Sequence, residues 1–212
     1  MQTLTEIALE QASRGVFTRQ EMACWLGGSP GRQFSLLKRA LAAAEVVRVH
    51  RGLYVLAEKY LRKKVDPLVL AQRLHGPSYI GLEMALAHHG WIPEAVYTVT
   101  SVSMDRAREF DTPLGRFSFV RVPQKTLYTA VRRVENGQGR SFLLASPLKA
   151  LADYVYVHKR NWDSAHPVVE SLRVDEESLA GVRAEEFDEL LGNYASQRVR
   201  RLLTGLRKDL DR

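Results

Sequence analysis

Two helix-start signals, separated by a pair of glycines, lie near the beginning of the chain. Thr18 and Glu21 have the spacing of a capping box, in which each side chain accepts a hydrogen bond from the other residue's amide. Gly27-Gly28 ends that helix after about two turns, and Ser29-Pro30 opens the next one with Ser29 as its cap. A short helix, a glycine turn and a second helix are the plan of a helix-turn-helix.

A helix before this pair and a β-hairpin after it complete the first predicted domain. Apolar residues recur at helical spacing from Leu4 to Ala12, and Gly15 is the expected stop. Residues 46–50 and 53–56 have the composition of two short strands, and Gly52 supplies the positive φ that a tight turn needs. We therefore expect a winged helix-turn-helix over residues 1–60.

The second helix of the pair carries the residues expected to contact DNA. Phe34, Leu37 and Leu41 form its predicted buried stripe, and about 100° per residue places several polar side chains on the opposite face. On the hairpin, basic residues stand at the edge and the tip, where phosphate or the minor groove is within reach. The predicted DNA-binding residues are Arg32, Gln33, Ser35 and Arg39 on the helix, and Arg48, His50 and Arg51 on the hairpin.

Positive charge is concentrated in the same part of the chain. The whole protein has a formal net charge of +7, and residues 1–64 hold eleven Lys/Arg against five Asp/Glu. Residues 161–212 are net negative, with eight Lys/Arg against eleven Asp/Glu. This distribution favours a phosphate backbone as the partner of the first domain.

A protein–protein module is the main alternative for residues 1–60. Three-helix units with a hairpin also bind proteins, and arginines on a helix are often simply solvated. The sequence favours DNA because three features coincide, namely the order of elements, a basic outward face and a basic hairpin tip.

Residues 65–212 are expected to form a second domain of the α+β class, with an antiparallel sheet and C-terminal helices. Asp66-Pro67 opens a predicted helix, and a further helix is expected from Tyr79 to His89. Extended patterns from residue 95 to residue 145 predict the strands, and Ser146-Pro147 opens another helix. Apolar spacing predicts a last amphipathic helix from Val199 to Leu210.

No motif in the chain predicts an enzyme. Residues 27–31 match the G-x-S-x-G pattern, but a capped helix precedes them where a nucleophile elbow needs a buried strand. His88-His89 are adjacent and lie about 100° apart on a helix, which makes them poor ligands for one metal ion. We expect no catalytic residue, no metal site and no cofactor.

The expected location is the cytoplasm. No apolar stretch approaches the length of a membrane span, and no secretory signal opens the chain. Cys24 is the single cysteine, so the chain can form no internal disulfide. We expect neither a membrane partner nor a thiolate zinc site.

Four passages together resemble the AbiEi-type abortive-infection antitoxins, which are also transcriptional regulators of phage-defence systems. The first is the Val-His-Arg-Gly-Leu-Tyr-Val run at residues 49–55. The second is Asp66-Pro67 followed by residues 79–90, which begin Tyr-Ile-Gly-Leu-Glu-Met. The third is Thr-Pro-Leu-Gly with Phe-Ser-Phe, residues 112–119, and the fourth is Ala-Ser-Pro-Leu-Lys-Ala-Leu-Ala-Asp, residues 145–153.

The resemblance implies a repressor and an antitoxin in one chain. Its N-terminal winged helix would bind double-stranded DNA at its own operator, in inverted repeats, as a monomer or a homodimer. Its second domain would counter a nucleotidyltransferase-type toxin without forming a stable complex, as in type IV toxin–antitoxin systems. Two alternatives remain, a stand-alone regulator whose second domain serves dimerisation or effector or protein binding, and an enzyme of nucleic-acid metabolism.

Overall fold

The computed structural model describes residues 3–12, 15–137 and 139–210. The chain divides into two compact units, Met1–Leu74 with Phe110–Gly115, and His75–Glu109 with Arg116–Arg212. The first unit thus runs past the boundary at residues 60–65 that the sequence predicts. Among the described residues, no helix combines the length and the apolar character needed to cross a membrane.

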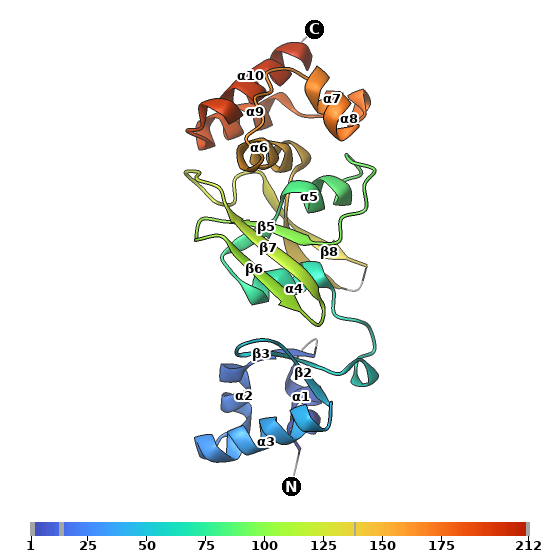
Figure 1. Ribbon diagram of the computed structural model, residues 1–212, viewed down its shortest axis with the longest axis vertical. Helices are drawn as coiled ribbons and strands as arrows, with labels where there is room; N and C mark the ends of the chain where they lie inside the picture. Colours follow the sequence, from blue (N-terminus) through green and yellow to red (C-terminus); the bar gives the residue numbers. More distant parts are fainter. Residues whose placement is uncertain (1–2, 13–14, 138, 211–212) are drawn as a thin grey trace. The chain divides into compact units, whose positions relative to one another are not determined.

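The first unit is built from small helices and a three-stranded sheet (Figure 1). The strands lie in the order β1-β3-β2, and both pairs are antiparallel. The elements follow one another as α1 (Leu4–Gln11), β1 (Val16–Thr18), α2 (Arg19–Leu26), α3 (Pro30–Ala42), β2 (Val46–His50), β3 (Leu53–Leu56), the 3₁₀ helix η1 (Glu58–Tyr60) and α4 (Pro67–Leu74).

The predicted starts of α2 and α3 are confirmed. The Glu21 amide donates to Thr18 Oγ1 at 3.1 Å, and the Thr18 amide donates to Glu21 Oε2 at 2.6 Å. Ser29 Oγ accepts from the Arg32 amide at 3.4 Å, with Pro30 in the first turn of α3. Helix α1 ends at Gln11; residues 13 and 14, just before the predicted stop at Gly15, lie outside the described residues.

The predicted buried face of α3 is wrong at one residue. Phe34 is 60% exposed, whereas Leu36 and Leu37 are each 5% exposed and pack in the core with Ala40. Leu41 is half-buried against the same core. The helix is rotated so that two adjacent leucines and an alanine face the core, which leaves Phe34 about 110° from the centre of the buried face.

A six-stranded sheet of order β6-β7-β5-β4-β9-β8 makes up most of the second unit, although the residues of β6 and β7 within Phe110–Gly115 belong to the first. Its strands are β4 (Ser78–Ile80), β5 (Val99–Ser103), β6 (Arg108–Thr112), β7 (Gly115–Arg121), β8 (Val131–Asn136) and β9 (Arg140–Ala145). Figure 1 shows α6 between this sheet and the C-terminal helices. The helices are α5 (Leu82–His88), α6 (Pro147–Val157), α7 (His166–Leu172), α8 (Glu176–Ala180), α9 (Ala184–Asn193) and α10 (Gln197–Leu210).

The α+β class is confirmed, but the sheet is mixed rather than antiparallel. Strands β4 and β5 pair antiparallel, as do β8 and β9. Strand β4 pairs parallel with β9, and β5 pairs parallel with β7. The expectation assumed that neighbours along the chain pair as hairpins, whereas the central strands pair across long connections, which can lead back to a parallel neighbour.

The predicted helix from Tyr79 to His89 begins later than expected. Tyr79 and Ile80 belong to the central strand β4 and are fully buried, and α5 starts at Leu82. Gly81 separates the two elements, and a Cβ there would lie 2.9 Å from a Val102 methyl group. The backbone therefore passes against β5 at a distance that only glycine permits.

Candidate nucleic-acid interface

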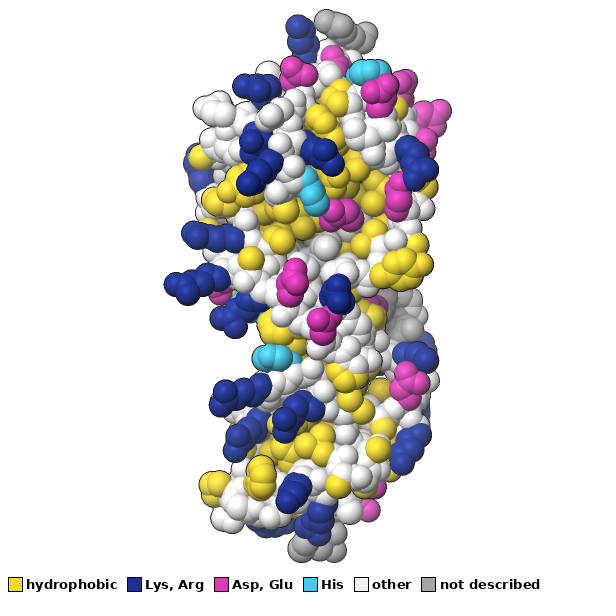
Figure 2. All heavy atoms as spheres, viewed as in Figure 1, with side chains coloured by type: hydrophobic (Ala, Val, Ile, Leu, Met, Phe, Trp, Pro, Cys, Tyr) yellow, Lys and Arg dark blue, Asp and Glu magenta, His cyan; other side chains and the backbone are white. Residues whose placement is uncertain are grey.

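Helix α3 presents an open, largely polar face. Gly31, Phe34, Ser35, Lys38 and Arg39 are all exposed. A side chain at Gly31 would meet no atom within 4 Å, so the surface beside the first turn is unobstructed. Lys and Arg side chains outnumber Asp and Glu on the visible face of the first unit (Figure 2).

Two of the predicted DNA-contact residues bond to the end of the preceding helix. Arg32 Nη1 donates to the Leu26 carbonyl at 3.1 Å. Gln33 Nε2 donates to the carbonyls of Gly27 at 3.1 Å and Ala23 at 3.4 Å. The last carbonyls of a helix lack partners within it, so these side chains satisfy α2 and fix the glycine turn. This role was not predicted from the sequence.

Ser35 and Arg39 are exposed on α3, as predicted, and also bond within the helix. Ser35 Oγ donates to the Gly31 carbonyl at 2.9 Å, one turn earlier. Arg39 Nε donates to the Ser35 carbonyl at 3.4 Å. A guanidinium has five N–H donors, so Arg39 keeps donors for an external acceptor.

The predicted hairpin residues Arg48, His50 and Arg51 are exposed at its edge and tip. The Arg48 guanidinium lies 6.0 Å from the centre of the Tyr54 ring, which holds it along the strand. The Gly52 carbonyl accepts from the Arg19 amide at 2.8 Å and so ties the turn to the start of α2.

Glu21 is held in its charged form beside this turn. Burial raises the pKa of its carboxyl group, but hydrogen bonds from the Thr18 amide and hydroxyl and the nearby Arg73 guanidinium more than offset that effect. The net result is a lowered pKa, so the capping box keeps its carboxylate at neutral pH.

A second constellation, which the sequence analysis missed, is a buried polar cluster in the second unit. Lys149 and Asp153 are fully buried and lie 3.4 Å apart on α6. Lys149 Nζ donates to Gln124 Oε1 at 2.5 Å and also bonds the Tyr194 hydroxyl. The Tyr79 and Tyr194 hydroxyls donate to Asp153 at 2.7 Å and 2.5 Å.

The charges of this cluster satisfy one another rather than a ligand. Burial lowers the pKa of Lys149, and the Asp153 carboxylate opposes that effect. Burial, reinforced by Asp153, raises the pKa of Tyr79 and Tyr194 well above 10.0. Because the side chains are buried and mutually bonded, we interpret the cluster as a structural pin between α6, β4 and the α9–α10 junction.

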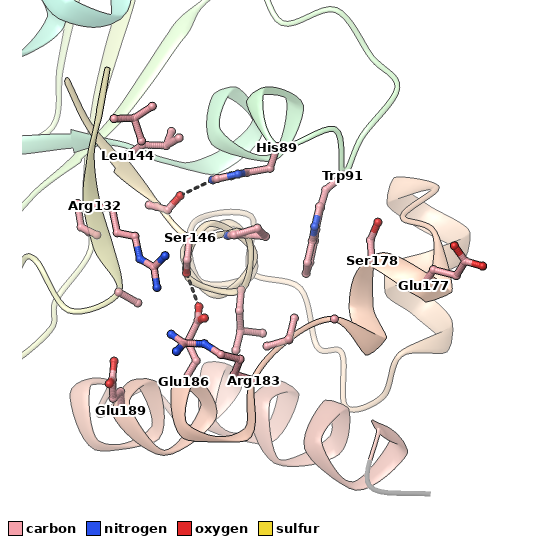
Figure 3. A pocket seen from close by; sticks show the side chains of 18 residues that line it. His89, Trp91, Arg132, Leu144, Ser146, Glu177, Ser178, Arg183, Glu186 and Glu189 are labelled. Carbon is pink, nitrogen blue, oxygen red and sulfur yellow. Dashed lines mark hydrogen bonds between the residues drawn. The ribbon is translucent and has the colours of Figure 1, made fainter. Parts of the chain in front are cut away.

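The second unit also contains a pocket of about 620 Å³ (Figure 3). Trp91, Leu144 and Leu148 give it apolar walls, while Arg132 and Arg183 add cationic groups. Three contacts frame the pocket at α6. His89 Nε2 lies 2.8 Å from the Ala145 carbonyl, Ser146 Oγ donates to Glu186, and Ser146 Oγ also caps α6 by accepting from the Lys149 amide.

One titratable side chain that lines the pocket is His89. Burial lowers the pKa of His89, and the hydrogen bond with Ala145 opposes that effect only in part. In the part of the chain that the structure describes, no three His, Cys, Asp or Glu side chains are grouped to hold a metal ion.

No protein-family model matches the chain, and no curated protein matches it.

Proposed function

We propose that this chain is a sequence-specific DNA-binding regulator that represses its own operon from the cytoplasm. Residues 1–60 act as a winged helix-turn-helix in this proposal. The observation that carries it is the capped helix α2, the glycine turn and the exposed helix α3, followed by an antiparallel hairpin with a basic tip. The concentration of positive charge in residues 1–64 supports it.

In the proposed complex, α3 enters the major groove and the hairpin follows the phosphate backbone. Arg39 and Ser35 are exposed and lie where base edges would be reached. Arg48, His50 and Arg51 contact phosphate and fix the register of the protein on the duplex. Arg32 and Gln33 act indirectly, because their bonds to α2 hold α3 at its angle.

A binding titration of the full chain tests the proposal. The probe is labelled duplex carrying the DNA upstream of the gene, with a shuffled duplex of equal composition as the control. We expect tighter binding to the upstream DNA and a loss of affinity with added salt, because phosphate contacts release counterions. Equal affinity for both duplexes would show that binding is not sequence-specific. A lack of binding at low salt would show that the chain does not bind DNA.

We further propose an antitoxin role for the second unit. It rests on the resemblance carried by residues 79–90 and 145–153, which contact one another in the fold. Tyr79 bonds Asp153, and His89 bonds the Ala145 carbonyl. The proposed target is a nucleotidyltransferase-type toxin that the chain opposes without a stable complex.

Growth rescue of cells that express a nucleotidyltransferase encoded next to this gene tests the antitoxin role. We expect rescue by the full chain and no co-purification of the two proteins.

A stand-alone regulator is the second candidate, and the pocket of about 620 Å³ is the observation that favours it, because its size suits a small effector. Operator binding without rescue would favour this candidate.

A further inference from the structure

Phe34 is an exposed aromatic ring on the helix proposed to enter DNA. Its side chain is 60% exposed, while the apolar residues Leu36 and Leu37 of the same helix are buried. Single exposed apolar residues are common on proteins and need no explanation by themselves. This ring calls for an explanation because it lies near basic residues on the open face of α3.

The polar neighbours of Phe34 in the first turns of α3 bond to backbone carbonyls. Arg32 and Gln33 donate to the end of α2, and Ser35 donates to the Gly31 carbonyl. Gly31 lies one turn before Phe34 and has open space where a Cβ would stand. The ring therefore projects from the first turns of α3, where the neighbouring polar side chains already donate hydrogen bonds within the protein.

Two exposed cations follow the ring along α3. Lys38 lies one turn further along α3 than Phe34 and is exposed, and Arg39 is exposed next to it. Residues four apart share a helix face, so Lys38 lies beside Phe34, whereas Arg39 lies about 140° round the helix. These cations favour a polyanion such as DNA as the partner of this face. An apolar partner would leave their charges unpaired.

We infer that Phe34 recognises thymine through its 5-methyl group in the major groove. This inference rests on the proposed DNA-binding function. Of the four bases, only thymine presents a methyl group there, and apolar side chains contact it. Phosphate contacts position α3 but carry no sequence information, so the ring adds base discrimination to that proposed for Ser35 and Arg39.

The experiment compares thymine with uracil, which differ by this methyl group alone. The upstream DNA is copied with either dTTP or dUTP, so that every thymine in the second probe lacks its methyl. The full chain and its Phe34→Ala variant are titrated with both probes. Leu9→Ala is the matched control, because Leu9 is an exposed apolar residue of the same unit on α1.

We expect the wild type and Leu9→Ala to bind the thymine probe about fourfold more tightly per contacted methyl, the value for one buried methyl group. Phe34→Ala should bind the two probes equally, and its melting temperature should match the wild type because the ring is exposed. Equal binding of both probes by the wild type would overturn the inference while leaving DNA binding intact. So would a thymine preference that Phe34→Ala retains.

Two further outcomes are distinguishable. If the wild type binds neither probe at low salt, the proposed function fails and the inference fails with it. If Phe34→Ala converts a dimer to a monomer in sedimentation velocity and the wild type binds both probes equally, the ring is a contact between copies of the chain. That result overturns recognition of thymine.

Discussion

At the scale of single residues, the buried cluster around Lys149 shows where sequence interpretation stops. Lysine and aspartate are almost never fully buried unless paired, so a pattern of charges is normally assigned to a surface. The spacing of Lys149 and Asp153, four residues apart, was the available signal. It could not reveal Tyr79 and Tyr194, because those residues reach the pair from distant parts of the chain.

Tyr79 predicts how stability falls at alkaline pH. Its folded pKa lies well above the ordinary value of 10.0, so above pH 10 the unfolded chain releases a proton that the folded chain keeps. Stability therefore falls as pH rises through 10, by about 1.4 kcal/mol per pH unit for each such tyrosine. Tyr79→Phe should cost about 1.5–3 kcal/mol at pH 8, from the lost hydrogen bond to a charged group.

The difference in free energy of unfolding between the wild type and Tyr79→Phe should then become smaller between pH 10 and pH 11. The reason is that the variant has no Tyr79 proton to release on unfolding. Urea unfolding at pH 8, 10 and 11 measures it. Tyr97→Phe is the matched control, since Tyr97 is 89% exposed and should change neither stability nor its pH dependence. A gap that stays constant with pH would contradict the burial argument.

Thr18 gives a residue-scale prediction in the first unit. Thr18→Ala removes the hydroxyl that accepts from the Glu21 amide and should lower the free energy of unfolding by about 1 kcal/mol. Urea unfolding followed by circular dichroism measures the change. Thr204→Ala, an exposed site on α10, should cause no loss. Equal midpoints for Thr18→Ala and the wild type would refute the energetic role of the cap.

At the scale of elements, the sequence predicted where several helices begin but not which face of α3 is buried. Capping residues and glycine turns act within about four residues, which is why the starts of α2, α3 and α6 follow from the sequence. The rotation of α3, which exposes Phe34, depends on what packs against it. Strand β4 has only three residues, too few for an alternating pattern to distinguish them from the start of α5.

Gly31 allows a variant that separates folding from binding. Gly31→Glu should raise stability by up to about 1 kcal/mol, because it removes a glycine and places an acid in the first turn of α3. The site has open space for the side chain. The same carboxylate would face DNA phosphate, so binding to the upstream duplex should weaken at least tenfold.

Gly192→Glu is the matched control for this variant, because Gly192 also has open space and lies in α9. It should leave DNA affinity unchanged. A stable Gly31→Glu protein that binds the upstream duplex with wild-type affinity would show that this face of α3 does not enter the groove.

At the scale of the whole molecule, the sequence predicted the α+β class but not the pairing of strands. The parallel pairs β4–β9 and β5–β7 join segments separated by other elements, and no local pattern encodes such register. The segregation of charge along the chain, unlike the pairing of strands, can be read from the sequence alone. The positive excess of residues 1–64 and the negative balance of residues 161–212 need no structure to be counted.

This segregation predicts which arginines govern the salt dependence of DNA binding by the full chain. Each phosphate contact contributes about −0.9 to the slope of log affinity against log salt concentration. Arg51→Ala should flatten the slope by about one unit and weaken upstream and shuffled duplexes alike. Arg39→Ala should weaken mainly the upstream duplex, by about 1–3 kcal/mol if it contacts a base.

Arg173→Ala is the charge-matched control in the second unit, where Arg173 pairs with Glu94. Titrations at four salt concentrations would compare the three variants with the wild type on both duplexes. Because Arg173 lies outside the basic first unit, its loss should leave slope and affinity unchanged. If Arg173→Ala flattened the slope as much as Arg51→Ala, phosphate contacts would extend to the second unit, and DNA binding could not be assigned to residues 1–60 alone.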